Sequence, residues 1–194
     1  VSGGVDTSLA ALGSGVISEG TALYSMGTGS NLVVPVRKRD FKNNIDYRLS
    51  MLPHVIKDIN LIFAIMGSTG GSLKWFKSEL AQLENIYSSH LKISPYEILD
   101  SEVKKTTAGS GGLIFLPYLS GELSPIWDPR AKGVFFGLSN NSSKSQMARS
   151  ILETAAESWS SSERVISKFT WSFEQAIVVT GGPSKSDIWM QILA

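Results

Sequence analysis

Three glycine-bearing turns are the features of this sequence that could bind a phosphate. Each follows an apolar run of strand length, at residues 27–30 (GTGS), 67–71 (GSTGG) and 181–182 (GG). Glycine lets a ligand approach the backbone closely, and a strand–turn–helix junction directs backbone N–H groups and the helix dipole at an anion. Each turn alone is also typical of an ordinary loop, and none matches the P-loop or the dinucleotide fingerprint. Because ligands gather at strand ends in α/β sheets, three such turns together indicate a nucleotide site.

Asp6 is the carboxylate that precedes the first helical pattern, residues 7–13 (TSLAALG). An aspartate in this position commonly caps the first turn of a helix, and position alone favours capping over catalysis. The two histidines, His54 and His90, lie too far apart in sequence to form a ligand pair and are expected in loops or at the surface. The absence of cysteine excludes disulfides and thiolate metal sites and favours a reducing compartment.

The elements that would position these turns alternate between strands and helices. A β-hairpin precedes a third strand, and the remaining strands are separated by helices, which predicts an α/β fold with a mixed sheet flanked by helices. The long helix is amphipathic, with Met147, Ile151, Ala155 and Trp159 on its apolar stripe. The predicted strands are 21–26, 31–36, 59–66, 112–122 and 175–182, with a short strand and turn within 133–142, and the predicted helices are 7–13, 72–83, 145–169 and 184–194.

Composition excludes several functional classes. The chain has 194 residues, 18 basic and 17 acidic, and a net charge of +1, which offers no electrostatic basis for binding nucleic acid or an anionic membrane. It has no apolar run long enough for a transmembrane helix and no secretory signal pattern. The first residue is not Met and a helical pattern runs to the last residue, so we expect a domain of a longer, cytoplasmic protein.

Six blocks, in order and covering nearly the whole chain, resemble the C-terminal domain of the FGGY carbohydrate kinases. The block at 133–153 fits the second signature pattern of that family throughout. The blocks are GGVDTSLAALGSG (3–15), SMGTGSN (25–31), GSTGGSLKWFKSEL (67–80), GLIFLPYLSGELSPIWDPRAKGVFFGLS (112–139), GVFFGLSNNSSKSQMARSILE (133–153) and VVTGGPSKSDIWMQILA (178–194).

The resemblance implies an actin-like (ribonuclease H-like) ATPase domain with a five-stranded mixed sheet, and ATP-dependent phosphorylation of a sugar hydroxyl. Asp6 matches the catalytic base of the family, which would accept the hydroxyl proton. The remaining implied site residues bind ATP: Gly27, Thr28 and Gly29 at the terminal phosphates, Gly70 and Lys74 at the nucleotide, and Gly181, Gly182 and Ser186 at the adenosine. An N-terminal domain would supply most sugar contacts and the main Mg²⁺ carboxylate, and a homodimer is among the expected assemblies.

The chain departs from the family pattern at several positions. Leu123 stands where the family has an arginine, Pro183 follows the glycine pair, and residues 158–162 (SWSSS) make the second half of the long helix polar. That polar surface could face solvent or an altered interface. The blocks are similar to both xylulose and gluconate kinases, so the sugar stays open. A non-catalytic nucleotide-binding module is the alternative from another class; Asp6 and the intact 27–29 turn favour an enzyme.

Overall fold

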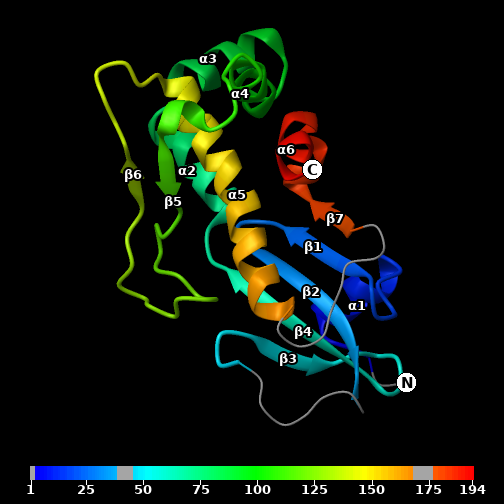
Figure 1. Ribbon diagram of the computed structural model, residues 1–194. Helices are drawn as coiled ribbons and strands as arrows, with labels where there is room; N and C mark the ends of the chain where they lie inside the picture. The colour runs from blue at the N-terminus through cyan, green and yellow to red at the C-terminus, as the bar shows by residue number, and fades with distance from the viewer. Residues whose placement is uncertain (1–2, 39–45, 168–176) are drawn as a thin grey trace.

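A five-stranded mixed sheet forms the centre of the chain, in the strand order β3-β4-β2-β1-β7 (Figure 1). The computed structural model describes residues 3–38, 46–167 and 177–194. Strands β1 and β7 are parallel, and the other neighbouring pairs are antiparallel. The strands of this sheet are β1 (Ala22–Met26), β2 (Ser30–Arg37), β3 (Ser50–Pro53), β4 (Ile59–Met66) and β7 (Ile177–Gly181).

The strand register brings the three glycine turns to one end of the sheet. Met26 pairs with both Ser30 and Gly181, and Ser30 pairs with Met66. The carboxyl ends of β1, β4 and β7 therefore lie side by side, and each is followed by one of the predicted turns. The opposite end holds the β3–β4 connection, where Pro53 pairs with Asn60.

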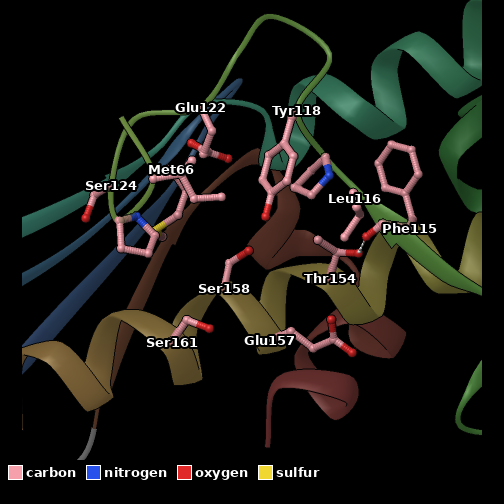
Figure 2. Close-up of a pocket in the computed structure, with 13 residues that line it drawn as sticks. Met66, Phe115, Leu116, Tyr118, Glu122, Ser124, Thr154, Glu157, Ser158 and Ser161 are labelled. Carbon is pink, nitrogen blue, oxygen red and sulfur yellow. Dashed lines mark hydrogen bonds between the residues drawn. The ribbon is translucent and has the colours of Figure 1, made fainter. Parts of the chain in front are cut away.

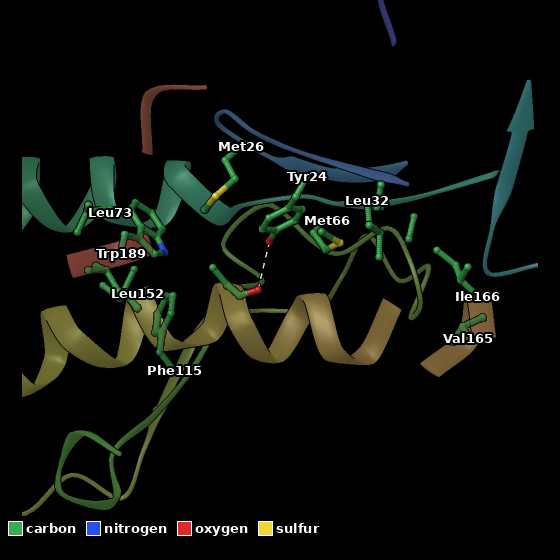
Figure 3. Packing of buried hydrophobic residues seen from close by; sticks show 14 of the residues in the cluster. Tyr24, Met26, Leu32, Met66, Leu73, Phe115, Leu152, Val165, Ile166 and Trp189 are labelled. Carbon is green, nitrogen blue, oxygen red and sulfur yellow. Dashed lines mark hydrogen bonds between the residues drawn. The ribbon is translucent and has the colours of Figure 1, made fainter. Parts of the chain in front are cut away.

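Two apolar layers cover the two faces of the sheet. On one face, Tyr24, Leu32 and Met66 pack towards α5 (Lys144–Ile166), which runs across the strands (Figures 1 and 3). On the other face, Leu23 and Val33 pack with α1 (Asp6–Gly13). Strand side chains alternate between faces, and this alternation assigns neighbouring residues of β1 and β2 to different layers.

A buried chain of hydroxyl groups joins the hairpin to two helices. Ser30 Oγ donates to Tyr24 Oη at 3.2 Å and accepts from Thr69 Oγ1 at 2.5 Å. Tyr24 Oη in turn donates to the Ala155 carbonyl of α5 at 3.2 Å, the dashed line in Figure 3. Burial raises the pKa of Tyr24 to about 12, so this hydroxyl stays protonated at neutral pH.

The helical segment after β4 differs from the sequence prediction of one helix over 72–83. It forms three helices, α2 (Thr69–Glu79), α3 (Gln82–Leu91) and α4 (Pro95–Val103), and neither α3 nor α4 was predicted as a separate helix. Leu73 and Phe76 are buried as expected, but Leu80 follows the end of α2 and is exposed. The short strand β3 was also missed.

The apolar run 112–122 contributes only β5 (Ile114–Leu116), which pairs with β6 (Val134–Phe136) in a separate two-stranded sheet. The rest of the run is irregular and passes alongside α5. The last predicted helix begins later than expected, as α6 (Asp187–Leu193), after a short 3₁₀ helix over Gly182–Lys185. The predicted ends at 168–169 and 175–176 lie outside the described residues. In the described part of the chain, no helix is long and apolar enough to cross a membrane.

Candidate functional site

A cavity of about 510 Å³ opens where the three glycine turns meet α2, α4 and α6. Six of the eight residues predicted to bind ATP line it: Gly27, Thr28, Gly70, Lys74, Gly182 and Ser186. Its other lining residues are Leu73, Ser94, Tyr96, Glu97, Asp100, Pro183, Lys185 and Trp189. Residues from four separate parts of the sequence therefore converge on one site.

The remaining two predicted residues, Gly29 and Gly181, do not line the cavity. Gly181 adopts φ 103°, and a Cβ atom there would lie 1.8 Å from the Met26 carbonyl oxygen. A side chain at Gly29 would meet the Met66 carbonyl oxygen at 2.5 Å. Both positions need glycine because backbone carbonyls of neighbouring strands approach them closely.

The first turn of α2 does not offer its backbone to a ligand in the way the sequence predicted. The Gly70 N–H donates to the Gly27 carbonyl at 3.1 Å, and the Gly71 N–H donates to the Thr28 carbonyl at 2.8 Å. These amides hold the hairpin turn against the helix. The close approach excludes a side chain at Gly70, where a Cβ would lie 2.3 Å from the Gly27 oxygen.

The hairpin turn has donors that no described residue uses. Among the described residues, no hydrogen bond involves the Thr28 amide, the Thr28 hydroxyl or the Gly29 amide. Lys74 and Lys185 add two exposed ammonium groups to the same cavity. This set of neutral donors and cations suits the terminal phosphates of a nucleotide.

The opposite side of the cavity is built by α4 and α6 and carries carboxylates. Ser186 Oγ accepts a hydrogen bond from the Trp189 amide at 3.2 Å, and Ser186 and Asp100 both line this side of the cavity. Burial raises the pKa of Asp100, and its interaction with the Ser186 hydroxyl opposes this shift. Acceptors beside a buried tryptophan suit the hydroxyls of a ribose or the amino group of a base better than they suit a phosphate.

Sequence reasoning missed the contribution of α4, although a signal for it was present. Ser94 caps α4 and forms a capping box with Glu97, with Pro95 at the first helical position. Ser-Pro-x-Glu is the expected sequence signature for such a helix start. The cap places Ser94, Tyr96 and Glu97 in the cavity wall, and Asp100 follows one turn later.

Asp6 does not line this cavity. It is exposed, it is the first residue of α1, and its Oδ1 accepts from the Thr7 amide at 2.7 Å. The helix cap is Val5, so the prediction that Asp6 caps α1 was wrong by one residue. Ser8 Oγ donates to the Pro53 carbonyl, which ties α1 to the end of the sheet opposite the glycine turns. The six residue steps of β4 between those ends span roughly 20 Å.

The same end of the sheet holds His54, which is buried and not at the surface. Its ring accepts from the Ile56 amide at 2.9 Å and contacts the Val16 carbonyl at 3.3 Å. Within residues 3–38, 46–167 and 177–194, no group of three acidic or histidine side chains could hold a metal ion.

Comparison with known proteins agrees with this arrangement. The chain is 29% identical to the gluconokinase of Bacillus subtilis (strain 168) over 195 aligned residues, covering 100% of this chain and 37% of that protein. It is 32% identical to the xylulose kinase of Lactococcus lactis subsp. lactis, covering 99% of this chain and 36% of that protein. The crystal structure of xylulose kinase from Rhodospirillum rubrum superposes with a TM-score of 0.81 at 28% identity, over 97% of this chain and 36% of that one.

These relatives are sugar kinases with the actin-like ATPase fold, and the chain spans just over a third of their length. Residues 22–194 match the C-terminal domain of the FGGY family of carbohydrate kinases. The overall fold of the chain is thus shared with a solved sugar kinase structure. The chain belongs to the FGGY family of carbohydrate kinases, as its C-terminal domain.

Proposed function

We propose that this chain is the ATP-binding part of a cytoplasmic sugar kinase, which transfers the γ-phosphoryl group of ATP to a hydroxyl of xylulose or gluconate. The observation that carries the proposal is the convergence of six predicted contacts on one cavity. Donors of the hairpin turn and two lysines lie on one side of that cavity, and hydroxyl and carboxylate acceptors on the other. A nucleotide has the matching polarity, with an anionic end and a neutral, hydrogen-bonding end.

The residues of the cavity have distinct roles in this proposal. Thr28 and the Gly29 amide bind the terminal phosphates, and Lys74 neutralises their charge, which a phosphoryl transfer requires. Gly182 forms the wall beside the adenosine, and Ser186 together with Asp100 accepts or donates hydrogen bonds at its neutral end. Mg²⁺ would be bound mainly through the phosphates and through carboxylates of the N-terminal domain that the family resemblance implies.

We also propose Asp6 as the general base, from its match to the family pattern. In the complete kinase, α1 would adjoin the N-terminal domain, and Asp6 would then have to face the sugar hydroxyl. A carboxylate placed against that hydroxyl can accept its proton.

A nucleotide-binding module without catalysis is the second candidate. The observation that favours it is the position of α1, which ties Asp6 to the end of the sheet opposite the cavity. Under this hypothesis the cavity binds ATP, but no group of this chain activates an acceptor.

Turnover by the complete kinase separates the two candidates. ADP release is measured with Mg²⁺ and ATP, alone and with D-xylulose or D-gluconate. The kinase proposal expects ADP release that depends on one of these acceptors and a phosphorylated product. ATP binding without any acceptor-dependent turnover would favour the binding module, and ADP release that no acceptor changes would indicate an ATPase and contradict both.

A further inference from the structure

A second cavity, of about 290 Å³, lies between α5 and the irregular segment that follows β5 (Figure 2). It shares no residue with the nucleotide cavity. Its walls combine apolar side chains with the polar side chains of Tyr118, Glu122, Ser158 and Ser161, and Glu157 lies at its exposed edge. The serines come from the polar half of the long helix, which the family resemblance left unexplained.

Glu122 is the polar group that is most strongly held in this cavity. Its side chain is buried, with only 5% of the residue exposed. Its Oε1 atom accepts from the Gly67 and Leu123 amides, both at 2.8 Å. Among the described residues no hydrogen bond involves Oε2, so one oxygen of a fixed carboxyl group remains for another partner.

Hydroxyl groups face the same space. Figure 2 shows the Tyr118 hydroxyl and the Ser158 hydroxyl pointing towards one another across the cavity, below Glu122. No hydrogen bond within the described residues involves either hydroxyl. The lining therefore offers both donors and acceptors that are not already used by the fold.

The charge of the lining restricts the class of ligand. Two carboxylates and no Lys, Arg or His line the cavity, which disfavours a phosphate or a carboxylate ligand. A protonated amine offers only donors, so it could not accept hydrogen bonds from the hydroxyls of Tyr118 and Ser158. A neutral hydroxyl both donates and accepts and matches all of these groups.

The volume of the cavity restricts the size of the ligand. Since a water molecule takes up about 30 Å³ in the liquid, 290 Å³ corresponds to roughly ten water-sized groups. A five-carbon polyol has ten non-hydrogen atoms. Its C–H groups would contact Met66 and Phe115, and its hydroxyls would reach the polar groups.

We propose that this cavity is a second binding site, for a neutral polyol of about five carbons, with Glu122 Oε2 and the hydroxyls of Tyr118 and Ser158 as its hydrogen-bonding partners. The proposal does not rest on the kinase activity. The contact between Glu122 and the Gly67 amide makes this amide a reporter of occupancy, because it bonds to the same carboxyl group as the polyol.

Binding is tested by titrating the ¹⁵N-labelled chain with ribitol and xylitol and following the amide resonances of Gly67 and Leu123. We expect saturable shifts at both amides with at least one polyol. Ribitol 5-phosphate and 1,5-diaminopentane are the charged probes, and we expect neither to bind at this site. No saturable shift with either polyol, or preferential binding of the diamine, would overturn the proposal.

Two variants localise the site. Ser158→Leu fills the cavity and should weaken polyol binding at least tenfold, whereas Ser160→Leu, on the same helix but outside the cavity lining, should leave it unchanged. Tyr118→Phe removes one hydroxyl and should weaken binding about two- to tenfold, since a hydrogen bond contributes about 0.5–1.5 kcal/mol. This variant keeps the test valid if Ser158→Leu does not fold. Equal affinity in Tyr118→Phe and the unchanged chain would exclude the site.

Discussion

At Gly182, a substitution can test ligand binding without disturbing the packing of the protein. A Cβ atom at Gly182 would have no heavy atom within 4 Å, and Gly182 does not adopt a positive φ. The position nevertheless lines the cavity that we propose as the nucleotide site. We therefore expect Gly182→Val to fold normally and to place its side chain where the adenosine would lie.

The size of the effect follows from overpacking. Forcing extra carbon atoms into an occupied, well-packed space costs about 1–3 kcal/mol, which corresponds to roughly 5- to 150-fold weaker binding of MgATP. Calorimetric titration with MgATP measures the affinity, and thermal denaturation without nucleotide measures the folding stability. We expect the melting temperature of the unliganded variant to stay within a few degrees of the unchanged chain.

Two glycine controls make the measurement specific. Gly13→Val adds the same side chain at the end of α1, also into open space but away from the cavity, and should change neither quantity. Gly181→Val should unfold the chain or lower its stability strongly, because its Cβ would lie 1.8 Å from the Met26 oxygen. Unchanged MgATP affinity in Gly182→Val would refute the placement of the adenosine beside this turn.

Three further predictions concern acid–base and hydroxyl groups. In the complete kinase, Asp6→Asn should lower kcat about 10²- to 10⁴-fold with ATP affinity nearly unchanged, as measured by initial rates and calorimetry; full activity would exclude Asp6 as the base. Asp100→Asn should raise the melting temperature at pH 7, because burial raises the pKa of Asp100 and its ionised form is therefore disfavoured in the folded chain. This gain should shrink as the pH falls through the folded pKa towards the ordinary value of 3.8, and a gain that does not depend on pH would contradict this cause. Tyr24→Phe should lower the free energy of unfolding by about 0.5–1.5 kcal/mol, measured by urea denaturation, and no change would mean that its bond to the Ala155 carbonyl contributes nothing.

The sequence predicted the elements whose periodicity is long and regular. The hairpin around residues 27–30, strand 59–66 and the long helix all lie within a few residues of their observed positions. Short elements were missed because their patterns are too brief to show a period. Strand β3 has four residues and contains a proline, and α4 is identifiable only from its Ser94–Glu97 cap.

The convergence of the glycine turns on one cavity was predictable, but the wall contributed by α4 and the hydrogen bonding of the turns were not. The glycine turns follow strands, and strand ends meet at one edge, so their convergence follows from the order of elements. Which amides stay free depends on the exact register between β1, β2 and β4. In that register the Gly70 and Gly71 amides donate to carbonyls of the hairpin. No local sequence pattern predicts these hydrogen bonds.

The backbone hydrogen bonds from Gly70 and Gly71 to the hairpin hold together two segments that are about forty residues apart in the sequence. An insertion or deletion in either turn would displace both partners, so the two turns have to change length together or not at all. Transplanting this nucleotide site into another protein would accordingly require the hairpin and the first turn of α2 as a pair, with β4 kept at its present length.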